Sequence, residues 1–272
     1  MTAVTKTTLF ALAAAMALAL LATITEAHSW ADCVDWRFNN PKKPGWTDKH
    51  GKCHGWARRY PVKTKYRFGD LDSASPNRHY EQDSKLYACS APGRGREDGA
   101  DERRANPVSK AYGGGFRPMA SVKAGDTMCV RWPSKNHASE YKVPPVFIYG
   151  PPSVTKEDPS QKQLLKMPIA KLNYNNCNRI RGDEDHTPCG GCFKIPSNRK
   201  TGTYMIQWRW ELNKGEFYTS CWDVQVKGRT VKPNVQSLPS NGTETTNDNE
   251  SSADEDHPLG DNSNAFSDLA RE

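Results

Sequence analysis

The sequence predicts an all-β protein, an antiparallel β-sandwich with long disulfide-stapled loops and a disordered C-terminal tail. Short runs alternate between apolar and polar residues with a period of two, which is typical of half-buried strands. Glycine and proline interrupt these runs throughout, and helical periodicity is scarce. The eight cysteines are an even number, which predicts disulfide bonds in an exported chain. A chain of 272 residues is long enough to bury a proper core.

The N-terminal segment 1–27 has the features of a secretory signal peptide. Lys6 precedes an apolar run from Leu9 to Ala22, and the small residue Ala27 precedes the expected cut. The run is shorter than the roughly 20 residues that span a membrane, although an uncleaved anchor is the alternative. Cleavage would make His28 the first residue of a secreted, extracellular protein. An N-terminal histidine offers an amine and an imidazole to one ion, a nitrogen donor set that suits Cu(II).

The strands are expected in a domain that covers residues 28–230. The loop 69–107 should lie on the surface. The segment 231–272 is rich in Asn, Ser, Thr, Asp and Glu, and contains glycosylation sequons at Asn241 and Asn249. We expect it to be a disordered, glycosylated tail because it has too little apolar surface to bury. The predicted strands are Thr127–Trp132, Val146–Tyr149, Tyr204–Glu211 and Phe217–Val226.

The cysteines allow two interpretations. Up to four disulfides are expected, and their pairing stays open because eight cysteines allow 105 arrangements. A zinc site is the alternative, since His186, Cys189 and Cys192 are evenly spaced and Cys177 lies upstream. Disulfides are favoured because thiols are consumed in an oxidising compartment. The cysteines are Cys33, Cys53, Cys89, Cys129, Cys177, Cys189, Cys192 and Cys221.

The charge is unevenly distributed along the chain. The formal net charge is +7, but residues 241–272 contain nine acidic side chains and one basic one, so residues 28–240 carry +15. A domain this basic favours a polyanion. Nucleic acid is not expected as the partner of a secreted protein, and an acidic polysaccharide such as pectate fits better. The alternative is that the excess of lysine and arginine only aids solubility.

A metal site built on His28 needs a second imidazole, and His137 is the best candidate. It follows the predicted strand Thr127–Trp132 and a short turn, so a rigid sheet end can position it. The alternative is an ordinary loop histidine. His257 is excluded because it lies in the tail. The other candidates are His50, His54, His79 and His186.

Glu216 and Tyr218 complete the candidate site. Residues two apart on a strand point the same way and lie roughly 6–7 Å apart. A phenol that approaches copper axially, with a carboxylate beside it that hydrogen-bonds an oxygen species, would make a redox site. The alternative is a core aromatic residue at Tyr218 and a solvated edge charge at Glu216. Cys221, three residues further on, could tether the strand.

Three segments resemble the lytic polysaccharide monooxygenases. They are His28 directly after the signal peptide, Trp132-Pro133-Ser134-Lys135-Asn136-His137-Ala138, and Glu216-Phe217-Tyr218-Thr219-Ser220-Cys221-Trp222-Asp223-Val224. Glu216 stands where cellulose-active fungal members have glutamine. The opening His28-Ser29-Trp30-Ala31-Asp32-Cys33-Val34-Asp35-Trp36 is most similar to the pectin-active enzymes secreted by oomycete plant pathogens. The resemblance spans residues 28–226.

The resemblance implies an immunoglobulin-like sandwich with one copper ion. His28 and His137 would form the histidine brace, Tyr218 would be the axial ligand, and Glu216 would act beside the metal. The implied activity is oxidative cleavage of homogalacturonan in the plant cell wall, as part of virulence. It would use an external reductant, a small molecule or a protein, with O2 or H2O2 as co-substrate. The protein is expected to act as a monomer, without nucleic acid or membrane partners.

Two further hypotheses come from other functional classes. One is a non-catalytic secreted copper-binding protein with the same brace. The other is a lectin-like effector that binds the cell wall through exposed tryptophans and the basic surface. Arg58 and Arg59 are guesses for basic residues that contact substrate. The tryptophans concerned are Trp30, Trp36, Trp46 and Trp56.

Overall fold

The computed structural model describes residues 29–63, 68, 86–91, 100–137, 142–178 and 185–228. The predicted signal peptide, His28 and the predicted tail 231–272 lie outside the described residues, as does most of the loop 69–107. In the described part, no helix is long and apolar enough to cross a membrane. The elements are β1 (Trp36–Phe38), β2 (Gly51–Cys53), η1 (Val108–Ala111), β3 (Ala120–Lys123), β4 (Thr127–Pro133), η2 (Lys135–His137), β5 (Val146–Tyr149), α2 (Gln161–Leu164), β6 (Pro168–Leu172), β7 (Pro188–Lys194), β8 (Gly202–Asn213) and β9 (Glu216–Lys227).

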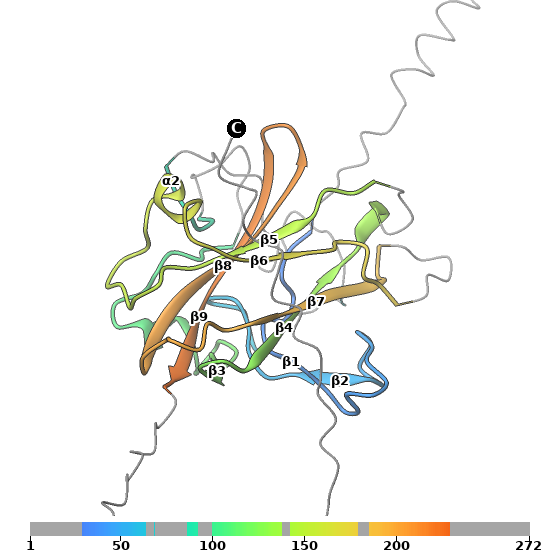
Figure 1. Cartoon of the computed structure of the whole chain (residues 1–272), viewed down its shortest axis with the longest axis horizontal. Coiled ribbons are helices and arrows are strands. Elements are labelled where there is room, and N and C mark those ends of the chain that lie inside the picture. Colours follow the sequence, from blue (N-terminus) through green and yellow to red (C-terminus); the bar gives the residue numbers. More distant parts are fainter. Residues whose placement is uncertain are drawn as a thin grey trace, which may run out of the picture. The chain divides into compact units, whose positions relative to one another are not determined.

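The strands form an all-β sandwich, as the sequence predicts. A five-stranded sheet has the order β3-β9-β8-β5-β6, and β4 pairs with β7 in a second layer (Figure 1). A short hairpin, β1–β2, lies beside β4. The four strands expected from the alternating pattern are β4, β5, β8 and β9, and all four are confirmed within a few residues at their ends.

One strand pair departs from the expected antiparallel arrangement. β3 runs parallel to β9, with Ala120 opposite Val224 and Lys123 opposite Lys227. Parallel neighbours need a long crossover connection, whereas antiparallel ones can be joined by a tight turn. Here the whole of the chain between Lys123 and Glu216 makes that connection, so no local turn pattern could have indicated the pairing.

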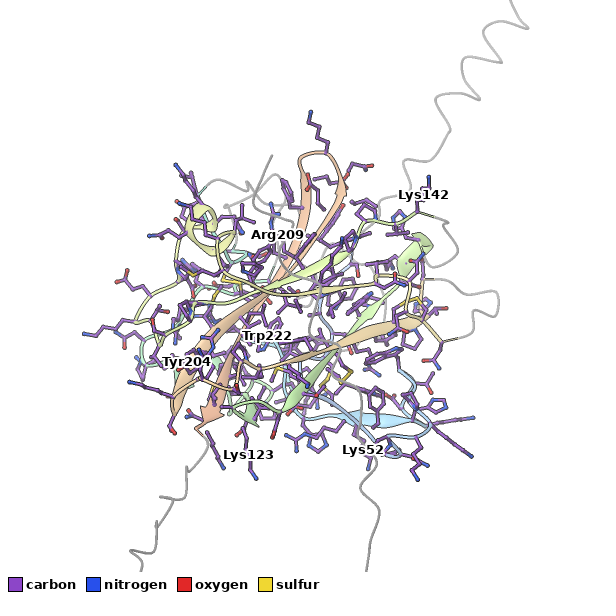
Figure 2. The ribbon with its side chains drawn as sticks, viewed as in Figure 1. Lys52, Lys123, Lys142, Tyr204, Arg209 and Trp222 are labelled. Carbon is purple, nitrogen blue, oxygen red and sulfur yellow. A yellow bond between two sulfur atoms is a disulfide. The ribbon has the colours of Figure 1, made fainter. Side chains whose placement is uncertain are left out.

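The core lies between the five-stranded sheet and the β4–β7 pair. Four tryptophans, Trp132, Trp208, Trp210 and Trp222, are completely buried there, and Figure 2 shows Trp222 inside the sandwich. Trp208 and Trp210 are two apart on β8 and therefore point to the same side. Aliphatic side chains from β4, β5 and β9 fill the space around them.

The opposite face of the five-stranded sheet is also covered. Gln207 on β8 is completely buried and donates a hydrogen bond to Gln161 of α2 at 2.7 Å, and another to the carbonyl of Ala88. Ser160 and Gln163 form a capping box that begins α2. The polar position Gln207 of the alternating pattern on β8 therefore lies against Ala88 and α2 and not in water, whereas Glu211 near the end of the strand is exposed.

Four disulfide bonds staple the loops to the sandwich, which confirms the disulfide interpretation. The zinc interpretation is excluded for Cys177, Cys189 and Cys192, since each is bonded to another cysteine. Cys221 is tethered, as expected, to a loop residue, Cys89. The bonds are Cys33–Cys53, Cys89–Cys221, Cys129–Cys192 and Cys177–Cys189.

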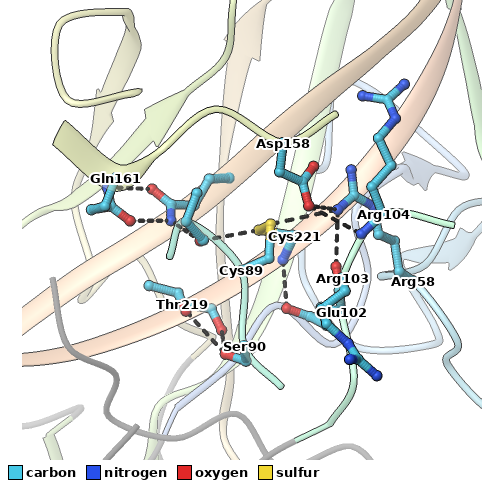
Figure 3. Close-up of a disulfide and its surroundings, with 12 residues drawn as sticks. Arg58, Cys89, Ser90, Glu102, Arg103, Arg104, Asp158, Gln161, Thr219 and Cys221 are labelled. Atoms are coloured by element: carbon cyan, nitrogen blue, oxygen red, sulfur yellow. Dashed lines mark hydrogen bonds and ion pairs between the residues drawn. A yellow bond between two sulfur atoms is a disulfide. The ribbon is translucent and has the colours of Figure 1, made fainter. Parts of the chain in front are cut away.

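A cluster of buried charges lies beside the Cys89–Cys221 bond (Figure 3). Arg58 is completely buried and donates to both carboxylate oxygens of Asp223, at 2.7 and 2.9 Å, and to Asp158 at 2.8 Å. Burial alone would lower the pKa of Arg58, but the two carboxylates outweigh it and raise the pKa. The guess that Arg58 contacts substrate is wrong, because its guanidinium is fully committed inside the protein. Arg59 is half-buried and donates to the carbonyls of Asp101 and Arg103.

Breaking this buried cluster should cost far more stability than breaking an exposed ion pair. We expect Asp223→Asn to lower the free energy of unfolding by about 3–5 kcal/mol, because the Arg58 charge is left without its main partner. Arg103→Ala, which breaks the exposed pair with Asp101, should cost about 1 kcal/mol or less. Urea denaturation of both variants measures the difference, and equal losses would contradict the assignment.

Two tyrosines, the buried Tyr60 and the half-buried Tyr112, predict a loss of stability at alkaline pH. Burial, then the neighbouring carboxylates Asp32 and Asp223, raise the pKa values of Tyr60 and Tyr112 well above the usual 10. Above about pH 10 the unfolded chain releases these protons while the folded protein keeps them, so the free energy of unfolding falls as pH rises. In Tyr112→Phe, the free energy of unfolding should fall less steeply with pH, by up to about 1.4 kcal/mol per pH unit. Urea denaturation at a series of pH values between 8 and 11 measures this slope. An unchanged slope would count against this view.

Candidate metal centre

His137 is held by the segment that follows β4. It ends the 3₁₀ helix η2, and its side chain is only 7% exposed. The amide of Ser134 donates to the carbonyl of Thr187 at 2.9 Å, and the hydroxyl of Tyr174 donates to the carbonyl of Ser134 at 3.0 Å. The loop that carries His137 is therefore fixed from two sides, as its place at a strand end predicts.

Lys135 occupies an unusual position in the same loop. Its backbone φ is 52°, which lies in the left-handed region that residues other than glycine seldom adopt. Its side chain is almost completely buried, and Nζ lies 3.7 Å from a carboxylate oxygen of Asp185. A strained residue of this kind costs about 1–3 kcal/mol and persists only where its surroundings hold it. The loop geometry before His137 is thus maintained by the burial and pairing of Lys135.

Trp210 is the contact shared by the candidate residues. Its ring centroid lies 5.4 Å from that of His137, in an edge-to-face arrangement, and 5.6 Å from that of Tyr218. The Tyr174 ring stacks on the Trp210 ring, with the two ring centroids 4.0 Å apart and an interplanar angle of 11°. The indole nitrogen donates to the carbonyl of Pro144 at 3.0 Å. Trp210 therefore has one orientation and brings His137 and Tyr218 together.

Tyr218 and Glu216 share one side of β9, as their spacing predicts. The Tyr218 ring is buried, and its hydroxyl donates to Oε1 of Glu216. Oε2 of Glu216 accepts from the side-chain amide of Asn213 at 2.6 Å. Both carboxylate oxygens thus have a donor inside the protein. The structure brings together His137, Tyr218 and Glu216, and we call these three with Trp210 the candidate centre.

His28 lies outside the described residues, but its chain neighbour does not. Ser29 is completely buried, and its hydroxyl donates to the carbonyl of Pro133 at 2.7 Å. The amide of Ala31 donates to the hydroxyl of Ser220 on β9 at 2.9 Å. The first described residues therefore lie between the end of β4, four residues before His137, and the strand that carries Tyr218.

The described residues alone do not form a complete metal site. No group of three or more His, Cys, Asp or Glu side chains among them is placed to hold a metal ion. His50 and His54 belong to the β1–β2 hairpin, where Nδ1 of His50 contacts the hydroxyl of Thr47 at 2.7 Å. His186 precedes Thr187, which contacts the His137 loop. His79 lies outside the described residues. A nitrogen site at His137 would thus depend on donors such as those of His28.

Sequence reasoning missed Trp210 and Tyr174. The register of β8 and β9 places Trp210 directly opposite Tyr218. Lys214-Gly215 forms the turn between these strands, and Gly215 has φ of 83°. Counting back from that turn would have placed Glu211 opposite Tyr218, because the pairing shifts by one residue between Glu211 and Asn213. The sequence pattern gave no sign of this shift. Tyr174 had no comparable pattern, since it lies in the turn after β6 and its contact with β8 joins segments that are distant in sequence.

The tryptophans of the lectin-like hypothesis do not form an exposed platform. Trp30, Trp36 and Trp46 are all buried, and Trp56 is half-buried under Arg117. This corrects the expectation that they stack on sugars, because a sugar ring needs an accessible aromatic face.

A cavity of about 660 Å³ lies away from the candidate centre. It is formed by residues 86–89, 103–106 and 156–160, beside the buried charges of Figure 3. None of the candidate-centre residues lines it. Its wall combines charged side chains such as Arg104 and Asp158 with the exposed Leu86.

Comparisons with known proteins give distant likenesses only. No protein-family model matches the chain, and no curated protein matches it. Among solved structures, an entomopoxvirus fusolin is 14% identical with a TM-score of 0.31, covering 54% of this chain and 51% of that one. The soluble domain of PmoD from Methylocystis sp. is 12% identical with a TM-score of 0.24, covering 40% and 78%. The chain spans about half the length of the fusolin chain. Likenesses this low carry no conclusion about activity.

The strain at Lys135 can be separated from its ion pair by two substitutions. Lys135→Ala removes the pairing with Asp185 and keeps the unfavourable backbone, whereas Lys135→Gly removes both. We expect Lys135→Gly to be more stable than Lys135→Ala by about 1 kcal/mol in urea denaturation, because glycine adopts positive φ without steric cost. The reverse order would mean that the backbone of the His137 loop is not strained.

Proposed function

We propose that this protein is a secreted copper-dependent monooxygenase that oxidatively cleaves glycosidic bonds in acidic polysaccharide, with homogalacturonan as the substrate class. The observation that carries the proposal is the meeting of His137 and Tyr218 on Trp210, with Ser29 anchored beside them. His28 precedes Ser29 directly, so a chain cut after Ala27 would begin next to a residue fixed at the end of β4.

The donors of the candidate centre fit copper by their chemistry. The His137 imidazole and the amine and imidazole of His28 are nitrogen donors, which Cu(II) favours, and a phenol oxygen from Tyr218 would lie nearby. Bound copper would supply one-electron chemistry, with an external reductant and O2 or H2O2 as co-substrates, to hydroxylate a sugar C–H beside the glycosidic bond. Tyr218 would be held in place by its hydrogen bond to Glu216 and by Trp210.

Trp210 and its neighbours give the centre rigidity and exclude water from its inner side. The His137 ring is mostly buried against Trp210, and Tyr218 is buried on the same indole. Preorganised side chains of this kind avoid the cost of rearranging ligands during a reaction. Asn213 and Tyr218 hold the Glu216 carboxylate from both oxygens, so Glu216 would act through the Tyr218 hydroxyl.

Two properties of the chain support secretion and the substrate class. Four disulfide bonds are typical of oxidising, extracytoplasmic compartments, and the sequence begins with a predicted signal peptide. The charge of +15 over residues 28–240 favours an acidic polymer over a neutral one.

A non-catalytic copper-binding protein is the second candidate, and one observation favours it. Both oxygens of Glu216 already accept a hydrogen bond from the protein, so an oxygen species would share this carboxylate with Asn213 and Tyr218 instead of having it to itself. Product analysis separates the two functions. Oxidised oligosaccharides released from polygalacturonate with ascorbate present support the enzyme, and copper binding without such products supports the second candidate.

Replacing His137 should remove copper binding. We expect His137→Ala to weaken Cu(II) binding by more than about a hundredfold in calorimetric titration, because a ligand is lost rather than a supporting contact. The same variant should release no oxidised oligosaccharides. Mass spectrometry of the secreted protein should give His28 as the first residue, with one copper per chain.

His54→Ala is the matched control, since His54 is an exposed histidine on the β1–β2 hairpin. It should bind copper and cleave substrate as the unmodified protein does. Tyr218→Phe should keep copper bound and change its electron paramagnetic resonance spectrum. Unchanged copper binding in His137→Ala would overturn the proposal.

A further inference from the structure

A group of exposed basic residues lies where β3 and β9 end. Lys123 is the last residue of β3 and Lys227 the last of β9, and the two are paired in the parallel register. Both side chains are exposed. Backbones of neighbouring strands lie about 4.8 Å apart, so two ammonium groups extend from adjacent positions. Like charges on neighbouring strand positions are unfavourable without a counter-charge.

Lys194 extends this group on the β4–β7 layer. It is the last residue of β7 and is exposed. The next residue, Ile195, exchanges backbone hydrogen bonds of 2.9 Å with Gly125 and Asp126, on the turn that follows Lys123. The ends of three strands from both layers therefore carry lysines at the same end of the sandwich.

The β1–β2 hairpin adds a second pair of like charges. Arg37 and Lys52 are directly opposite each other in the antiparallel register, and both are exposed. Nη2 of Arg37 donates to the carbonyl of Ser121 on β3 at 3.3 Å, which joins the hairpin to the lysines of the sandwich. Figure 2 shows Lys52 and Lys123 extending from the same edge of the molecule. We call Arg37, Lys52, Lys123, Lys194 and Lys227 the basic end.

The acidic side chains in these segments compensate only part of this charge. Asp35 pairs with Arg37 at 2.7 Å, and Asp126 is exposed on the turn between β3 and β4. Asp48, in the loop of the hairpin, pairs with Arg131 at 2.9 Å, outside this group. Five cations thus face two carboxylates. Two strand pairs, β3–β9 and β1–β2, place cations directly opposite one another. Such an arrangement costs stability in the free protein, and an anionic partner that binds there relieves the repulsion.

The basic end is remote from the candidate centre. Both are on β9, which begins with Glu216 and Tyr218 and ends with Lys227. At about 3.3 Å per residue, Tyr218 and Lys227 on this strand lie roughly 30 Å apart. A charge at this distance is screened at physiological ionic strength, where the Debye length is about 8 Å. The charges of the basic end therefore do not act directly on a sugar bound at the candidate centre. Any role of the basic end in binding substrate requires a separate contact with the polymer.

We propose that the basic end binds acidic polysaccharide as a second contact, independent of the candidate centre. The proposal rests on the proposed function for its substrate class. The ligand is a polymer with repeated carboxylates, because the cations are spread over three strand ends and a hairpin rather than gathered in a pocket. Binding at two separate surfaces raises the local concentration of polymer at the centre without any new contact there.

The test compares two triple variants of the full chain that lose the same charge. Lys123→Gln, Lys194→Gln and Lys227→Gln remove three cations from the basic end. The control, Lys156→Gln, Lys162→Gln and Lys166→Gln, removes three exposed cations from the segment around α2. Binding to polygalacturonate is measured by calorimetry on copper-free protein at several salt concentrations. We expect the first variant to bind about tenfold more weakly with a shallower salt dependence, and the control to bind as the unmodified protein does.

Four results would overturn the proposal. Equal weakening in both triple variants would mean that net charge alone governs binding. Equally tight binding of fully methyl-esterified homogalacturonan would exclude carboxylate recognition, and tighter binding of duplex DNA would assign the surface to nucleic acid. Binding lost in His137→Ala would place the contact at the candidate centre. Since copper is absent from the assay, a failure of the monooxygenase proposal leaves this result unaffected.

Discussion

The packing of Trp210 is the interaction on which the candidate centre depends. This indole stacks on Tyr174 and contacts His137 and Tyr218. Its nitrogen donates a hydrogen bond to the carbonyl of Pro144. Buried aromatic pairs gain energy from their geometry as well as from the area they bury. One fully buried side chain thus orients residues from β9 and from the loop after β4, which are distant in sequence. The centre is consequently an extension of the hydrophobic core.

The sequence predicted the fold class and singled out His137, Tyr218 and Glu216, but it did not predict Trp210, through which His137 and Tyr218 meet. Period-two alternation identified β4, β5, β8 and β9, because each has one face in the core. The same alternation did not reveal that Gln207 on the other face is buried. A loop that covers this face does not change the alternating pattern of the strand's own sequence. The spacing of Glu216 and Tyr218 gave their shared side, whereas the contact of His137 with Trp210 joins different elements and depends on tertiary packing.

The two faces of the five-stranded sheet have different physical roles. The inner face packs aromatic and aliphatic side chains, and the candidate centre lies at its end. The outer face carries Asp223 in a buried ion cluster with Arg58, beside a disulfide. A buried pair of this kind contributes little net stability relative to a hydrophobic one, but it penalises any arrangement that leaves one charge alone. Arg58 therefore helps to select one position for the loops that cross this face.

The parallel pairing of β3 with β9 has a consequence for how the protein is made. A chain emerging from the ribosome presents β3 about a hundred residues before β9 exists. Cys89 likewise cannot form its disulfide bond until Cys221, 132 residues later, has been synthesised. Contacts between such distant segments slow folding and leave strand edges open to wrong partners in the interval. Closure of the larger sheet is therefore a late event, completed only after nearly the whole domain has been synthesised.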